Sequence, residues 1–432
     1  MSTDARPTGI YSWYVVLLLS ALYVVSFIDR VVLNLLVDPL RAEFGLSDTQ
    51  ISLLQGAAFA IFYGVFGLPL ARIADVGNRK ILIIAGVVVW SLATISSAFA
   101  TGFAMLVALR AGLAIGEAAL SPAALSMFAD LFDKDKRSLP CSIYVAAGLV
   151  GSFAAFIVGS VVVDWVEAGG RIGPLAALEP WRAVFVLVGL PGLVLAVLMA
   201  VTVREPCRIT GPKDETPSLR QVMGVLQAQP RLYIGMLVGG GLLAIVTSSL
   251  PAWVPSLLIR NHGFSIAQAG AAYGLIGVAA SALGTILIPR IADAWMRRGR
   301  ADALLTVFIA AVLAGTPAMA FFAVADDATT LLLTLGIAIF LWYGAVAIPI
   351  LAVQQVAPPR MRATFTAGLF FVKTFIGFAS GPTIVAVLSD YMFGGEQTLG
   401  LALMTLTLII APLSLMLVAL ARRPFATVVA AS

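Results

Sequence analysis

Five charged residues interrupt long apolar stretches of this chain: Asp29, Arg30, Arg110, Glu117 and Lys373. Four of them fall in the first and fourth stretches. A charge at bilayer depth costs several kcal/mol unless it is paired, neutralised or hydrated. Such residues therefore indicate an ion or substrate pathway.

The spacing of polar residues in the first stretch indicates one inward-facing stripe. Tyr23, Ser26, Arg30 and Asn34 follow one another at helical intervals and so share a face of a helix. Asp29 lies about 100° around the helix from Arg30. We expect this face to line a polar cavity.

The fourth stretch repeats the combination of acid and base. Arg110 and Glu117 are two turns apart on one side of a helix, separated by about 10 Å along its axis. Gly112 and Gly116 lie between them at the spacing that lets a neighbouring helix approach closely. The fourth helix is thus expected to pack tightly where its charges lie.

These side chains suit proton transfer. Burial favours the neutral form of a carboxylate and a nearby arginine favours the charged form, so movement of one relative to the other couples motion to protonation. We expect Asp29 and Glu117 to carry protons, with Arg30 and Arg110 as partners; Asp29 paired with Arg30 is the favoured arrangement. The alternative is a static buried network, in which loss of one partner destabilises folding.

The same cavity is expected to bind the substrate. Arginine can hold a phosphate or carboxylate through two parallel hydrogen bonds, whereas Lys373 could either bind an anionic group or extend to water near a membrane surface. The single histidine, His262, and the two cysteines offer no metal cluster, and no cofactor is expected. The candidate substrate-binding residues are Tyr23, Ser26, Arg30, Asn34, Gln55, Glu117 and Lys373.

The composition indicates the elements that position these residues. Of the 432 residues, 60% are hydrophobic and only 11% are charged, and the mean hydropathy is +1.01. Because about 20 apolar residues cross a bilayer as a helix, the sequence predicts an all-α membrane protein with twelve spans. The predicted spans are 13–36, 49–72, 80–100, 103–127, 140–163, 181–202, 231–258, 266–288, 303–325, 330–355, 364–389 and 399–421.

Most of the lysine and arginine residues fall in the connections on one side, so both termini are predicted to be cytoplasmic. The first stretch is too long for a signal-peptide core and is expected to remain as a helix. Cys141 and Cys207 lie on the cytoplasmic side and should stay reduced. The excess of arginine over lysine, and the absence of an Asn-x-Ser/Thr site, favour a bacterial inner membrane.

The longest polar connection divides the twelve stretches into six and six. We predict an N-terminal bundle at 1–202, a cytoplasmic linker at 203–230 and a C-terminal bundle at 231–432. The tetrapeptide Arg-Ile-Ala-Asp occurs at 72–75 and again at 290–293, after the second and eighth stretches. A duplicated six-helix unit explains this repeat, and transporters of that kind bind substrate between their halves.

The repeated loops also predict a cytoplasmic gate. Asp75 and Asp293 could accept hydrogen bonds from helix N-termini or pair with arginines while the cytoplasmic side is shut. The simpler explanation is ordinary basic loop chemistry with an incidental carboxylate. The predicted gate residues are Asp75, Arg79, Lys80, Arg137 and Asp293.

The sequence resembles spinster-like members of the major facilitator superfamily. The resemblance spans nearly the whole chain, and departs from the usual pattern at Ala71, where the superfamily has glycine, and at Val76, where a basic residue is usual. We therefore expect a weaker gate. The matching segments are 27–30 (FIDR), 47–55 (SDTQISLLQ), 75–80 (DVGNRK), 116–118 (GEA), 130–132 (DLF) with Arg137, 381–382 (GP) and 389–390 (SD).

The resemblance implies a twelve-helix carrier that works by alternating access and moves an amphipathic lipid with an anionic head, such as a lysophospholipid or sphingolipid. An organic-acid/proton symporter of the same superfamily is the alternative. A membrane enzyme is disfavoured because the residues for its chemistry are missing, and a channel because no filter-like loop is evident. The expected partners are protons, an anionic or amphipathic substrate and the lipid bilayer. We expect no nucleic-acid partner, since the net charge of +5 follows from membrane topology. We also expect a monomer.

Overall fold

The computed structural model describes residues 9–133, 136–171, 173–208, 219–358, 361–395 and 397–431. Every regular element in these ranges is helical. Twelve helices in the described chain are long and apolar enough to cross a membrane, which confirms the predicted all-α fold with twelve spans. Several helices outrun the predicted stretches: the stretch predicted at 266–288 belongs to α13, Ile266–Arg297. Helical backbone bonds continue beyond the apolar residues, so hydropathy understates helix length.

The chain divides into two compact units by its internal contacts. The first contains Met1–Gly211 with Phe264–Leu275, and the second contains Pro212–Gly263 with Ile276–Ser432. The start of α13 thus packs with the first unit: Tyr273 meets Phe156 edge-on, with ring centroids 4.8 Å apart. The duplicated arrangement of 1–202 and 231–432 remains a prediction, and residues 209–218 of the predicted linker lie outside the described residues.

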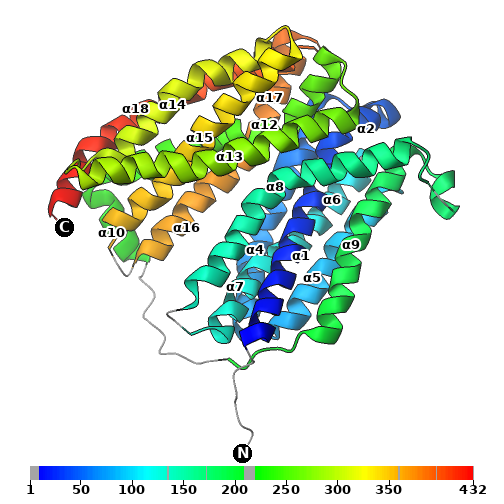
Figure 1. The fold of residues 1–432 in the computed structure, drawn as a ribbon, viewed down its shortest axis with the longest axis horizontal. Helices are drawn as coiled ribbons and strands as arrows, with labels where there is room; N and C mark the ends of the chain where they lie inside the picture. Colours follow the sequence, from blue (N-terminus) through cyan, green and yellow to red (C-terminus); the bar gives the residue numbers. More distant parts are fainter. Residues whose placement is uncertain are drawn as a thin grey trace, which may run out of the picture. The chain divides into compact units, whose positions relative to one another are not determined.

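In the first unit, α1 packs along α8, and α5 packs against α6 and α9 (Figure 1). Buried side chains such as Leu19, Leu22, Trp90 and Phe128 form its core. Its helices are α1 (Gly9–Leu35), α2 (Val37–Phe44), α3 (Asp48–Ser52), η1 (Leu53–Ala57), α4 (Ala58–Val76), α5 (Arg79–Ser97), α6 (Phe103–Ala118), α7 (Leu120–Leu131), α8 (Ser138–Glu167), η3 (Gly173–Ala177) and α9 (Pro180–Thr202).

In the second unit, α14 packs against α15 and α18, and α12 packs against η7 and α18. The predicted linker contains a short helix, α10, which hydropathy alone did not indicate. The helices are α10 (Leu219–Ala228), α11 (Pro230–Ile234), η4 (Gly235–Gly239), α12 (Gly240–His262), most of α13, α14 (Ala303–Phe321), η5 (Phe322–Val324), α15 (Ala328–Val356), α16 (Arg362–Val372), η7 (Lys373–Phe378), α17 (Ala379–Val387), η8 (Leu388–Phe393) and α18 (Leu399–Ala431).

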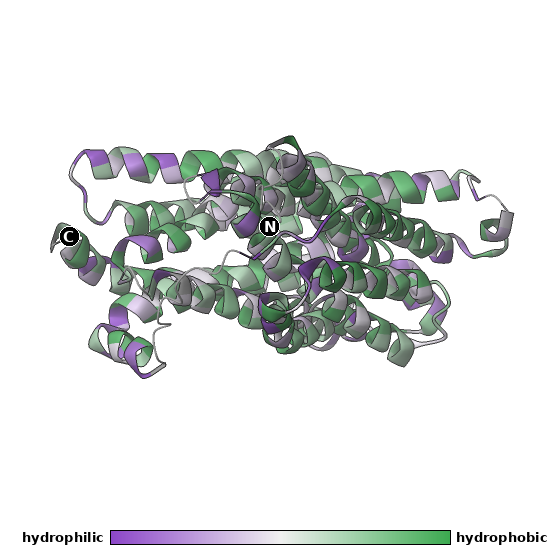
Figure 2. Cartoon of the chain, turned by 90° about the horizontal axis from the view of Figure 1, so that it is seen from below, coloured by the Kyte–Doolittle hydropathy of each residue, from purple (hydrophilic) through white to green (hydrophobic). Residues whose placement is uncertain are grey.

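The outer faces of many helices are apolar. Large hydrophobic side chains such as Leu17, Val161 and Leu333 are exposed. Figure 2 shows hydrophobic residues along the length of the helices and hydrophilic residues concentrated towards many of their ends. A surface of this kind suits contact with lipid chains.

Among the described residues, four wide π-helical turns, η1, η4, η7 and η8, lie within the spanning helices or, for η8, at the end of one. The turn η7 precedes Pro382, which has no N–H to donate back to the previous turn. Two side chains of α12 bond to the main chain here: Ser248 donates to the Gly377 carbonyl (2.9 Å) and the Trp253 indole to the Pro382 carbonyl (2.9 Å). The neighbouring helix thus provides side-chain donors to two main-chain carbonyl groups beside the proline.

Candidate functional site

An ion pair between α1 and α6 lies inside the first unit. Arg30 Nη2 donates a hydrogen bond to Glu117 Oε2. The Arg30 guanidinium lies 4.2 Å from the ring centroid of Phe59 and 4.9 Å from that of Phe27. The Arg30 side chain is 21% exposed and that of Glu117 only 2%. The arginine therefore joins a buried acid to a more accessible space, with two aromatic faces that favour its charge.

Gly116 permits the helix crossing that positions Glu117. A Cβ atom on Gly116 would lie 2.5 Å from the Gly86 carbonyl oxygen and 2.9 Å from the Trp90 backbone nitrogen, both on α5. Since these are main-chain atoms, a larger residue would push the helices apart. At the companion glycine Gly112, the nearest atom would be the Cβ of Ala93 at an ordinary 3.6 Å.

Asp29 is buried beside the ion pair without taking part in it. It is 1% exposed and lies beside the side chains of Trp90 and Thr94, although neither carboxylate oxygen accepts a well-formed hydrogen bond from the described residues. Asp29, Thr94 and Arg110 line a cavity of about 10 Å³, which is close to the space that one water molecule needs. Arg110 Nη2 donates to the carbonyl oxygen of Arg30 at 3.0 Å. Asp29 thus faces Arg110 across this cavity.

The structure pairs Arg30 with Glu117, whereas the sequence led us to favour a pairing of Arg30 with Asp29. Consecutive residues of a helix point about 100° apart, so Arg30 and Asp29 face different neighbours. Arg30 faces α6 at the height of Glu117, and Asp29 faces Arg110, which lies about two turns before Glu117 in α6. The four predicted proton-coupling residues therefore form one chain: Asp29, Arg110, Arg30 and Glu117.

The remaining residues of the α1 stripe have distinct surroundings. Tyr23 stacks on Tyr144 with ring centroids 4.6 Å apart, and the Tyr144 hydroxyl bonds Ser121 at 3.0 Å. Ser26 is buried and donates to the carbonyl of Tyr23 in its own helix (2.9 Å). Asn34 is half-buried. Sequence reasoning missed Tyr144, because an aromatic residue in an apolar helix carries no positional signal of its own.

Gln55 and Lys373 lie on π-helical turns, Gln55 on η1 and Lys373 on η7. Lys373 belongs to the second unit, where its Nζ lies 5.8 Å from the ring centroid of Phe370. Wide turns of this kind are frequent at functional sites, which makes both positions worth testing.

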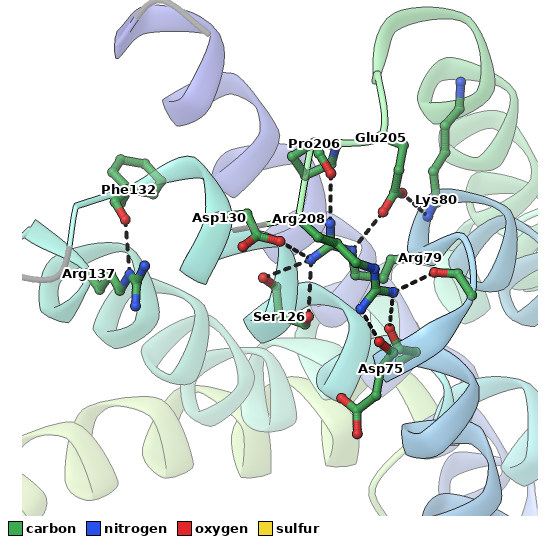
Figure 3. Close-up of polar contacts among 12 residues, drawn as sticks. Asp75, Arg79, Lys80, Ser126, Asp130, Phe132, Arg137, Glu205, Pro206 and Arg208 are labelled. Carbon is green, nitrogen blue, oxygen red and sulfur yellow. Dashed lines mark hydrogen bonds and ion pairs between the residues drawn. The ribbon is translucent and has the colours of Figure 1, made fainter. Parts of the chain in front are cut away.

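At the end of the first unit where α5 begins, Arg79 joins three segments. Its guanidinium donates to Asp130, to the carbonyl and hydroxyl oxygens of Ser126 (3.1 Å each), to Glu205 (2.7 Å) and to the Pro206 carbonyl (2.8 Å). Figure 3 shows these acceptors converging on one side chain. We call Arg79, Ser126, Asp130 and Glu205 the Arg79 cluster. It fastens α5 to α7 and to the chain that follows α9.

The other predicted gate residues lie around this cluster or apart from it. The Lys80 backbone N–H donates to Glu205 (2.8 Å), and its side chain to the Ala200 carbonyl (2.7 Å). Arg137 Nε donates to the Phe132 carbonyl (2.9 Å). Asp75 is exposed, and Asp293 is half-buried in the second unit.

Sequence reasoning missed two residues that follow α9. Glu205 belongs to the Arg79 cluster, and Arg208 donates to the backbone carbonyls of Ala74, Asp75 and Gly77 (Figure 3). Both lie in the predicted linker, where charged residues are expected in any case.

Comparison with known proteins decides the family. The sequence profile described as Major Facilitator Superfamily matches residues 19–382. The chain belongs to this superfamily. Its helical composition and twelve spans agree with that membership, and the predicted family is confirmed.

Relatives within the superfamily include spinster proteins. An "MFS-type efflux pump" of Mycolicibacterium smegmatis is 29% identical over 405 residues, covering 91% of this chain and 89% of the relative. "Protein spinster homolog 1" of Homo sapiens is 28% identical over 417 residues, covering 89% and 75%. The crystal structure of a bacterial homologue of the human lysosomal transporter Spinster, in an inward-facing and unoccupied conformation, matches with a TM-score of 0.82 and 26% identity over 98% of both chains. The protein is thus a multi-pass membrane transporter of the superfamily, related to spinster.

Proposed function

We propose that this protein is a proton-coupled secondary transporter in which Asp29 carries the proton. The proposal rests on one observation: the Asp29 carboxylate is buried and accepts no well-formed hydrogen bond from the described residues. It lies beside Arg110 and a water-sized cavity. A buried, unpaired carboxylate is strongly disfavoured in its charged form. Burial therefore opposes the charged form of Asp29, while Arg110 across the cavity provides a cation that would stabilise that form.

The chain of contacts suggests how protonation reaches the substrate site. Arg110 holds the backbone of Arg30, and Arg30 holds Glu117. Ionised Asp29 would attract Arg110, and this attraction competes with the hydrogen bond from Arg110 to the Arg30 carbonyl. Loss of the proton on one side of the membrane and its recovery on the other would thus change the position of Arg30 relative to Glu117 and Arg110 in each transport cycle. Glu117 is the second proton carrier or a part of the substrate site.

We propose that the substrate is an amphipathic molecule with an anionic head, such as a lysophospholipid or a sphingolipid. Arg30 is partly exposed and surrounded by aromatic rings, which suits a phosphate or carboxylate joined to an apolar chain. The likeness to spinster homologues and to an efflux pump supports this class. An organic acid with a small body is the alternative, because Arg30 could bind its carboxylate equally well.

We place the protein in a bacterial inner membrane as a monomer with both termini in the cytoplasm. The basic loops support the orientation, and the Arg79 cluster then lies at the cytoplasmic end of the first unit. The proposed partners are the proton, the substrate and the surrounding lipid.

The test is transport into liposomes under an imposed pH gradient. A gradient of one pH unit stores about 1.4 kcal/mol per proton. This is enough for roughly tenfold accumulation of substrate if each electroneutral transport cycle moves one proton. Asp29→Asn should fold and still equilibrate substrate across the membrane, yet accumulate none. The matched control is Asp326→Asn, at an exposed residue between α14 and α15.

Two outcomes bear directly on the proposal. Uphill accumulation by Asp29→Asn equal to that of the unaltered protein excludes Asp29 as the carrier. A loss of transport that follows a matching loss of thermal stability favours the static buried network. A panel of lysolipids, sphingoid phosphates and organic acids then separates the two substrate classes, and Lys373→Met tests its contact with the anionic head through a higher apparent KM.

A further inference from the structure

A second cavity lies at the end of the first unit where α1 and α8 finish and α9 begins. Its volume is about 230 Å³. Leu36, Val163, Val166, Trp181 and Val184 line its walls, and each of them is buried. The cavity is far from the Arg79 cluster in the helix order, since it lies at the other end of α9. Nothing in the proposed transport cycle uses it.

The charged residue that lines this cavity is Glu167, the last residue of α8. It is exposed, and so is Asp164 one turn earlier, whose charge acts on Glu167. Two acids therefore stand at an apolar cavity. Their mutual repulsion is relieved by any cation bound between them and the cavity.

The nearby arginines are engaged elsewhere. Arg182 lies 4.3 Å from the ring centroid of Trp181, pairs with Glu43 at 3.0 Å and donates to the Ala98 carbonyl at 2.6 Å. Arg171 donates to the Leu178 carbonyl at 2.6 Å. Neither arginine lines the cavity, so the charge presented at its rim is negative.

We propose that this cavity binds a single-chain amphiphile with a positively charged ammonium head. The apolar walls would hold the alkyl chain, and Glu167, reinforced by Asp164, would hold the head. The volume lies below the range of about 300–1,000 Å³ typical of sites for drug-sized molecules, which suits one chain and not two. The charge preference is opposite to that of Arg30, so this site is distinct from the proposed transport site and does not depend on it.

Photocrosslinking of the full-length protein in nanodiscs tests the proposal. The probe is an alkyltrimethylammonium with a diazirine at the end of a ten-carbon chain, and crosslinked peptides are mapped by mass spectrometry. Unlabelled decyltrimethylammonium, decanol and decyl sulfate compete with it, so that the chain is constant and only the head changes. Val163→Phe fills the cavity, Glu167→Gln removes the rim charge, and Val161→Phe is the matched control on the exposed side of α8.

Crosslinks should fall on the ends of α8 and α9. The ammonium compound should compete at a concentration about fivefold lower than decanol, and Glu167→Gln should remove this advantage. Val163→Phe should lower crosslinking by about tenfold, because it displaces two or more methylene groups. Equal competition by the three heads, crosslinks spread over lipid-facing helices, or equal effects of Val161→Phe and Val163→Phe would each overturn the proposal. Thermal unfolding of each variant separates loss of the site from loss of the fold.

Discussion

Removal of the Arg79 side chain should loosen the first unit at one end. Arg79 has no exposed surface, and its guanidinium bonds two carboxylates, one hydroxyl and two backbone carbonyls. Arg79→Met deletes this cation and leaves Asp130 and Glu205 without it. A methionine of similar length keeps the apolar packing of the side-chain stem, so the change reports mainly on the polar contacts.

The magnitude follows from the burial of the two acids. Removal of one partner from a buried ion pair costs about 3–5 kcal/mol. The side chains of Asp130 and Glu205 are 11% and 24% exposed, so water can partly replace the arginine. We therefore expect a loss of about 2–4 kcal/mol. Arg79→Lys keeps the charge but cannot reach all the acceptors together. Its stability should therefore lie between that of the unaltered protein and that of Arg79→Met.

The assay is thermal unfolding of the purified protein in detergent, with Arg72→Met as the matched control. Arg72 is exposed at the end of the neighbouring helix, α4. Arg79→Met should lower Tm by about 4 °C or more, since a cooperative unit of the size of the first unit shifts by about 2–4 °C per kcal/mol, and combination with Asp130→Asn should cost less than the sum of the single changes. A Tm within 1 °C of the unaltered protein, using the conversion of about 2–4 °C per kcal/mol, or an equal effect of Arg72→Met, would refute the reasoning.

Three further outcomes are expected. Gly116→Ala should destabilise the protein by about 1–3 kcal/mol and impair transport, whereas Gly112→Ala should do neither; equal effects would disprove the close approach of α5 and α6. Although burial opposes it, hydrogen bonds from Arg422 and Thr306 hold the pKa of Asp302 below its usual value. Asp302 therefore stabilises the folded protein above its unfolded pKa of about 4, and this contribution disappears as the pH falls through the lower folded value. Asp302→Asn should accordingly lower Tm at neutral pH but not under strongly acidic conditions, and a Tm difference that persists in acid would contradict this. Cys207 is exposed and should react with a membrane-impermeant maleimide in inside-out vesicles only; labelling in intact cells would reverse the proposed orientation.

The spanning helices were predictable because each leaves a local mark on the sequence. A stretch of about 20 apolar residues is sufficient evidence for a span, and Asn78 also signals the start of α5 by capping it, with its side chain accepting the Ile81 N–H at 2.9 Å. The π-helical turns were not predicted, because hydropathy is insensitive to whether a turn contains one residue more. Helix α10 was not predicted because it is short and its apolar residues alternate with polar ones, so its mean hydropathy is low.

The charged residues of the candidate site were predictable as a set, but their pairing was not. An isolated charge in an apolar stretch is conspicuous, so Asp29, Arg30, Arg110 and Glu117 could be selected from the sequence. Which acid faces which base depends on the rotation of α1 against α6, and tertiary packing sets that rotation. The Arg79 cluster shows the same limit, since Glu205 is 126 positions along the chain from Arg79 and only folding brings them together.

The wide turn η7 has a consequence for comparisons among relatives. A π-turn holds one residue more than the α-helical turn it replaces, so loss of a single residue at 373–378 could be absorbed by reversion to an α-helix. Every side chain on one flank would then turn by about 100° relative to the other. Two relatives that differ by one such deletion would present different residues at equivalent heights of the same helix, and a gap placed elsewhere in an alignment would misassign the counterpart of Lys373. A one-residue length change here could thus redirect specificity without any substitution.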